Sequence, residues 1–115
     1  MAYDDKLASR IRTVLASRKG FSEKKMFGGI AFMMNGKMCC GVQDGDLVAR
    51  IGADEYARAL AEPHVRPMDF TGRPMKGYVY VGRGVTRNDR GLQAWVERAI
   101  AFTTSLPERK ARKDR

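Results

Sequence analysis

Residues 26–42 read MFGGIAFMMNGKMCCGV, and this stretch decides the fold. Two apolar runs flank Asn35-Gly36, a pair that favours a two-residue type I′ turn because both residues tolerate a positive φ. The stretch therefore predicts a β-hairpin with strands over residues 26–34 and 37–42. With Asn35-Gly36 as the whole loop, the expected facing pairs are Met34 with Lys37, Met33 with Met38, and Phe32 with Cys39.

Both faces of this hairpin are rich in apolar side chains. A sheet with one solvated face alternates apolar and polar residues, so the hairpin must be covered on both sides or lie in the middle of a sheet. Helices are expected to cover one side. On the other side, Met33, Met34 and Met38 would suit an adaptable contact with a loop, a second chain or another partner. The alternative is that these methionines are ordinary core residues.

Helical spacing of apolar residues marks both ends of the chain. An amphipathic helix is predicted over residues 5–18, where Leu7, Ile11, Val14 and Leu15 share a face and Gly20 provides the stop. A second long helix is predicted over residues 89–104, from the stripe Leu92, Trp95, Val96, Ala99 and Ile100. A short helix is expected from Asp54 to Leu60, because Pro63 prevents its continuation.

Two further strands complete the predicted sheet. Asp44-Gly45 indicates a turn, after which residues 47–51 return as a third strand. Residues 78–81 read YVYV and predict a fourth strand over 77–82, with tyrosines on one face and valines on the other. Residues 63–77 contain three prolines and are expected to be extended or looping.

These elements predict an α+β fold in which a central antiparallel β-meander sheet is packed by the N-terminal and C-terminal helices. The predicted core takes the inward candidate of each element. It consists of Ile11, Leu15, Phe27, Ile30, Phe32, Leu47, Val79, Trp95 and Val96.

The composition is that of one water-soluble domain. The chain has 115 residues, of which 43% are hydrophobic and 30% charged. We expect the domain to span residues 1–106, and a basic, disordered tail to occupy 107–115. No apolar run approaches the roughly 20 residues that a membrane span needs, and the first residues are polar rather than an apolar signal core. A cytoplasmic location without membrane association is therefore expected.

Cys39 and Cys40 are adjacent in the predicted hairpin. On a regular strand they would point to opposite faces, and a disulfide between them would be a strained vicinal link. Both are expected to be reduced, buried thiols. The alternative is that one is exposed near Lys37, whose charge favours the thiolate, and senses oxidation.

The formal net charge is +9, and much of it is concentrated in one part of the predicted domain. Residues 63–90 hold six basic residues against Asp69 and Asp89, a net charge of +4. A basic surface attracts nucleic acid because binding releases counterions from the phosphates. The candidate residues for binding a nucleic acid or a partner protein are Arg66, Arg73, Lys76, Arg83 and Arg87.

Three alternatives compete for these basic residues. The charge can serve solubility alone, or Arg66 or Arg73 can pair with Asp69 or Glu62 and so hold the loop. Tyr78 and Tyr80 can also stack on bases as in single-strand binders, although alternating tyrosines are ordinary strand residues.

The sequence offers no recognisable catalytic or metal-binding set. His64 is the sole histidine, and no Cys or His stands at metal-ligand spacing from it. Gly82-Arg83-Gly84 lacks the third glycine of a dinucleotide fingerprint. We therefore expect no enzyme activity, no cofactor and no metal.

Residues 25–38 read KMFGGIAFMMNGKM and resemble the opening sheet of the TfoX N-terminal domain family. The order of DLVAR at 46–50, RPMDF at 66–70, KGYVY at 76–80 and a closing helix with Trp95 is also similar to that family. The resemblance covers roughly residues 5–104. It implies a bacterial α+β regulatory or adaptor domain, of the kind linked to transcriptional control of competence, with DNA or a transcription-regulator protein as partner. The alternative function is a homodimerising protein-interaction domain that binds no nucleic acid.

Overall fold

The computed structural model describes residues 4–16, 18–26, 28–69 and 74–106. In chain order the elements are α1 (Asp5–Leu15), β1 (Phe21–Met26), β2 (Gly29–Met34), β3 (Lys37–Gln43), β4 (Asp46–Arg50), α2 (Ala53–Leu60), β5 (Val65–Asp69), β6 (Pro74–Val81), α3 (Arg83–Thr86) and α4 (Asp89–Thr104). The predicted α+β class with helices from both ends is confirmed.

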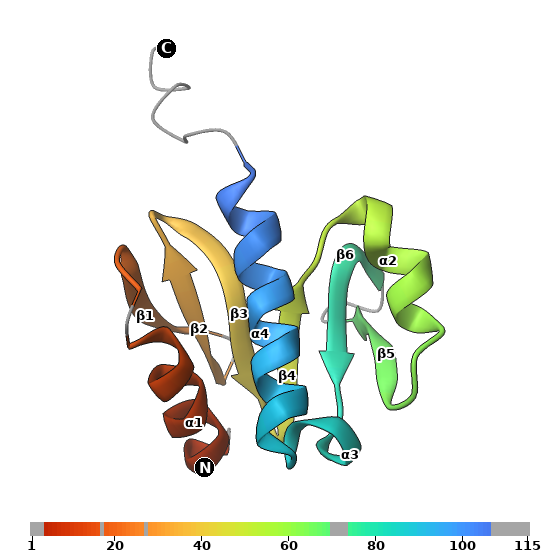
Figure 1. The fold of residues 1–115 in the computed structure, drawn as a ribbon, viewed down its shortest axis with the longest axis horizontal. Coiled ribbons are helices and arrows are strands. Elements are labelled where there is room, and N and C mark those ends of the chain that lie inside the picture. Colours follow the sequence, from red (N-terminus) through yellow and green to blue (C-terminus); the bar gives the residue numbers. More distant parts are fainter. Residues whose placement is uncertain (1–3, 17, 27, 70–73, 107–115) are drawn as a thin grey trace.

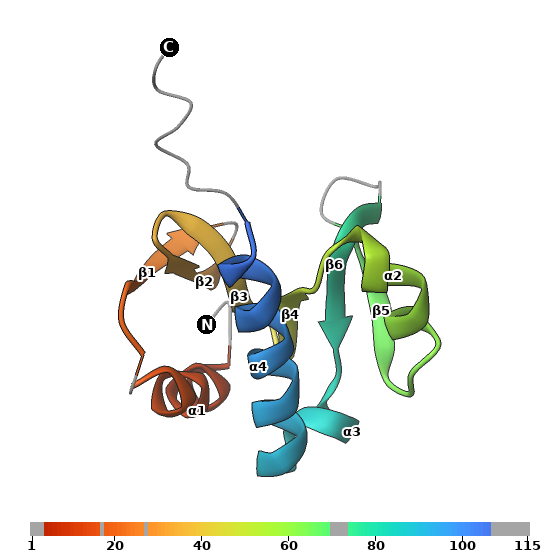
Figure 2. The same ribbon diagram turned by 45° about the horizontal axis from the view of Figure 1, so that its top comes forward.

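The strands form one antiparallel sheet with the order β1-β2-β3-β4-β6-β5. The helices α1, α2 and α4 lie on the same face of this sheet, as Figures 1 and 2 show from two directions. The strands β2, β3 and β4 follow the predicted meander, and β1 extends it at one edge of the sheet. Because β6 lies between β4 and β5, the meander ends at β4.

Two of the six strands were not predicted, and both lie at the edges of the sheet. The single strand expected over 26–34 was wrong: Gly28, at φ 76°, lies in a turn that separates β1 from β2. The segment expected to be extended or looping contains β5, whose pairing with β6 is shifted between Pro67 and Asp69. Charged residues in β1 and a proline in β5 are typical of edge strands, which avoid pairing with other chains in this way.

The Asn35-Gly36 hairpin forms as predicted, but its register holds only near the turn. Met34 pairs with Lys37 and Met33 with Met38. A β-bulge then shifts the register, so Phe32 pairs with Cys40 and not with Cys39. The first predicted helix also ends earlier than expected, at Leu15, whereas the last spans residues 89–104 as predicted.

The bulge also corrects the expectation for the two cysteines. Both are fully buried and belong to the core on the helix side of the sheet. The two side chains therefore lie together, and not on opposite faces. The neighbouring Cys40 thiol and Thr103 of α4 lower the pKa of Cys39, whereas the Cys39 thiol and burial raise the pKa of Cys40.

The predicted core is confirmed for every member inside the described residues; Phe27 lies outside them. Ile11, Leu15, Ile30, Phe32, Leu47, Val79, Trp95 and Val96 are all buried between the sheet and the helices. The other face of the sheet carries Met33, Met38, Tyr78 and Tyr80, all half-buried. Met34 points to the helix side, where it packs against the core.

Candidate functional site

The predicted basic residues lie at two opposite ends of β6. Arg83 begins α3 just after the strand, and Arg87 follows that helix by one residue. Lys76 is exposed near the start of β6, beside the segment that leads from β4 into α2. Arg73 lies outside the described residues. The chain therefore brings Arg83 and Arg87 together and separates them from Lys76.

Arg66 lies at the same end of the sheet as Arg83, but it already forms an ion pair with a carboxylate of the protein. Its guanidinium donates to Asp46 of β4 at 2.8 Å and lies 5.0 Å from the centre of the Tyr80 ring. For Arg66, the alternative partners Asp69 and Glu62 were wrong, and Glu62 accepts instead from Arg98 at 3.0 Å. The same alternative for Arg73 lies outside the described residues. Arg66 thus joins the two strands on either side of β6, and this ion pair reduces the charge that it offers to a ligand.

A cleft of about 220 Å³ opens beside Arg83 and Arg87. Its other wall is the first part of α1, which contributes Lys6 and Arg10. Asp4, Leu7, Gly45 and Thr86 complete the lining. Residues far apart in the chain therefore place four basic side chains around one small space.

Two local features hold the walls of this cleft in place. The Asp4 side chain caps α1 by accepting from the backbone N–H groups of Lys6 and Leu7, at 3.0 and 3.1 Å. The backbone N–H of Asp4 also donates to the carbonyl of Asp44 at 2.7 Å. Because Asp44 belongs to the β3–β4 turn, this bond fixes the start of α1 against the turn that contains Gly45.

The lining of the cleft is strongly positive. Four basic residues stand against one acidic residue, Asp4, a net formal charge of +3. Arg10 donates to Asp89 at 2.8 Å, and the Asp89 side chain is 95% exposed. Within the described part of the chain, no ion pair joins Lys6, Arg83 or Arg87 to a carboxylate.

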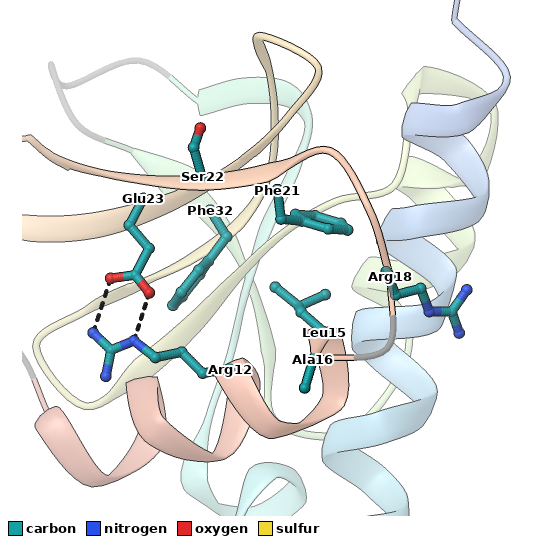
Figure 3. Close-up of a pocket in the computed structure, with 8 residues that line it drawn as sticks. All are labelled: Arg12, Leu15, Ala16, Arg18, Phe21, Ser22, Glu23 and Phe32. Carbon is teal, nitrogen blue, oxygen red and sulfur yellow. Dashed lines mark hydrogen bonds and ion pairs between the residues drawn. The ribbon is translucent and has the colours of Figure 1, made fainter.

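A larger pocket of about 510 Å³ lies between α1 and the edge formed by β1 and β2 (Figure 3). Leu15, Phe21 and Phe32 supply its apolar lining. Arg12 at its mouth donates to both carboxylate oxygens of Glu23, at 2.6 and 3.0 Å, and these bonds lower the pKa of that carboxyl. Arg18, the second arginine in the lining of this pocket, is bound to the carboxylate of Glu97 in α4. This pocket therefore presents little uncompensated positive charge.

The described residues contain no cluster of three or more His, Cys, Asp or Glu side chains suited to a metal ion. His64, the residue on which histidine chemistry would depend, is exposed, and its ring packs against Gly84. This contact gives Gly84 a packing role. Among the described helices none is long and apolar enough to cross a membrane.

Comparison with protein families matches residues 13–103 to the TfoX N-terminal domain. The chain belongs to the TfoX N-terminal domain family. Comparison with curated proteins and with solved structures gave no match. The matched segment contains Arg66, Arg83 and Arg87, whereas Lys6 and Arg10 precede it.

Sequence reasoning found one wall of the cleft in this TfoX N-terminal domain and missed the other. Arg83 and Arg87 were predicted because they lie in the basic stretch over residues 63–90. Lys6, Arg10 and Gly45 were missed, since their place in the cleft depends on a contact between Asp4 and a turn forty residues later. The Asp44-Gly45 turn was itself predicted, but its neighbours in space could not be read from the sequence.

Proposed function

We propose that this TfoX N-terminal domain is a bacterial regulatory or adaptor domain that contacts DNA through its basic cleft. The family membership and the fold support a role of this kind. The observation that carries the contact with DNA is the cleft itself, where Lys6, Arg83 and Arg87 face solvent around a space of about 220 Å³. Such a contact neutralises backbone phosphates and needs no base-specific readout.

The charge of the cleft sets the expected binding behaviour. Each phosphate neutralised on duplex DNA contributes roughly 0.9 to the slope of log affinity against log salt. Replacing Arg83 and Arg87 together by alanine should therefore lower that slope by about 0.9 unit if both arginines bind the same phosphate, and by about 1.8 units if each binds its own. Binding should weaken similarly for unrelated DNA sequences, because phosphate contacts carry no sequence information.

The test is a fluorescence anisotropy titration of labelled duplex DNA at several salt concentrations. A matched control replaces Lys19 and Arg58, two exposed cations away from the cleft, so that the net charge changes equally. The proposal predicts that the control retains the wild-type slope. Equal losses in the two double variants would mean that only overall charge matters, and no binding by the wild type at low salt would refute the proposal.

One observation favours a second function, a homodimerising interaction domain. Met33, Met38, Tyr78 and Tyr80 lie half-buried on the sheet face opposite the helices, where apolar and aromatic side chains suit a protein contact. Such an interface responds weakly to salt. Sedimentation of the purified protein at low and high salt distinguishes the two functions, since a dimer stable at high salt together with no binding to DNA supports the interaction domain.

A further inference from the structure

The basic cleft has the size and the charge of a site for one phosphate group. We infer that it binds a single phosphate, with Arg83, whose guanidinium lies against Gly45, as a principal ligand. The inference deepens the proposed function and rests on it, because the phosphate is taken to belong to the backbone of DNA. A free phosphate monoester offers the same oxygens and is the other source.

Arg83 is seated directly against the β3–β4 turn. A methyl group on Gly45 would overlap Nη2 of Arg83 and would lie 2.8 Å from Nε and 2.9 Å from Cζ. The guanidinium therefore occupies the space that the missing side chain leaves. The planar guanidinium offers two parallel donors to a phosphate.

The remaining cations approach from two helical segments. Lys6 and Arg10 are four residues apart on α1, and Arg83 and Arg87 are four residues apart across α3, so each pair lies on one side of its helix. The bond between Asp4 and Asp44 fixes α1 to the same turn that seats Arg83. Charge-assisted hydrogen bonds to phosphate oxygens are therefore available from both walls of the cleft.

The volume limits what the cleft can hold. Pockets for drug-sized ligands usually measure about 300–1,000 Å³, and 220 Å³ is below that range. A whole nucleotide does not fit inside the cleft. A phosphate group fits when the sugar that carries it stays outside. With Arg10 paired to Asp89, the cations Lys6, Arg83 and Arg87 against Asp4 leave a net charge of +2, which favours an anion with several acceptor oxygens.

Gly45→Ala tests this geometry without changing any charge. The new methyl would meet only the end of a flexible side chain, so the variant should fold normally while Arg83 leaves its seat. We expect Gly45→Ala and Arg83→Ala each to weaken duplex DNA binding by roughly three- to tenfold, and the Arg58→Ala control to bind like the wild type. A second arm titrates inorganic phosphate while the backbone amides of residues 83–87 are followed by NMR. Those amide shifts should be reduced in both cleft variants.

The outcomes separate the two proposals. If Arg83→Ala weakens DNA binding and Gly45→Ala does not, the inference that binding depends on the position of Arg83 against Gly45 is wrong. The proposed contact between the cleft and DNA is then retained. If inorganic phosphate shifts the amides but no DNA binds, the site is for a free phosphate group and the proposed function fails. If neither probe binds the wild-type protein, both are refuted.

Discussion

Replacing Gly41 by alanine should destabilise the domain. Gly41 is buried in β3, where an added methyl would overlap the carbonyl oxygen of Ile30 and lie 3.2 Å from the Cα of Ala31. Both atoms belong to the backbone of β2, so relief requires the paired strands to separate. Overpacking of this kind costs typically 1–3 kcal/mol. We therefore expect the free energy of unfolding to fall by about 2 kcal/mol, against a slight entropic gain from replacing glycine.

The assay is urea unfolding followed by the fluorescence of Trp95, the single tryptophan, a buried residue of α4. A loss of about 2 kcal/mol corresponds to a fall in Tm of roughly 8–10 °C for a domain of this size. Gly45→Ala is the matched control, because its methyl meets a movable guanidinium rather than backbone. Unchanged stability of Gly41→Ala, or an equal loss in Gly45→Ala, would refute this account of the two glycines.

Three further results are expected. Asp4→Ala removes the cap of α1 and should cost about 1 kcal/mol, seen as faster hydrogen exchange in the first turn of that helix. The Arg12 bond lowers the pKa of Glu23, so it stabilises the fold at pH values above the ordinary glutamate pKa. This stabilisation is lost as the pH falls through the lowered pKa of Glu23. Glu23→Gln should therefore reduce the acid sensitivity of unfolding, by less than about 1 kcal/mol because the pair is partly exposed. Cys39 and Cys40 should resist a thiol reagent in the native protein and react fully in urea, and rapid native reaction of either would contradict their burial.

Local sequence signals predicted the centre of the sheet and missed its edges. Asn35-Gly36 specifies its hairpin because few other residues accept the backbone angles of the turn, and the apolar stripe around Trp95 specifies α4. The bulge opposite Phe32 has no comparable signal, since an extra residue in one strand leaves the apolar pattern almost unchanged. Strands β1 and β5 were missed because edge strands carry the charges and prolines that otherwise indicate loops.

The candidate site was predictable only where its residues are neighbours in sequence. Arg83 and Arg87 are four residues apart and belong to one basic stretch, so they were found together. Lys76 belongs to the same stretch, yet the length of β6 carries it to the other end of the sheet. Lys6 lies at the cleft because the backbone hydrogen bond between Asp4 and Asp44 places the start of α1 there. No sequence pattern in either segment predicts this hydrogen bond.

The most direct test of the proposed function is an NMR titration of the isotope-labelled protein with a short DNA duplex at low salt. We expect the largest shifts at the backbone amides around the cleft, namely those of Lys6, Gly45 and residues 83–87, and these shifts should disappear as salt is added. The amides near Lys76, at the other end of β6, and those near Arg58, on α2, should hardly move. Shifts confined to that other end, or to the sheet face with Tyr78 and Tyr80, would contradict the proposal that the basic cleft contacts DNA.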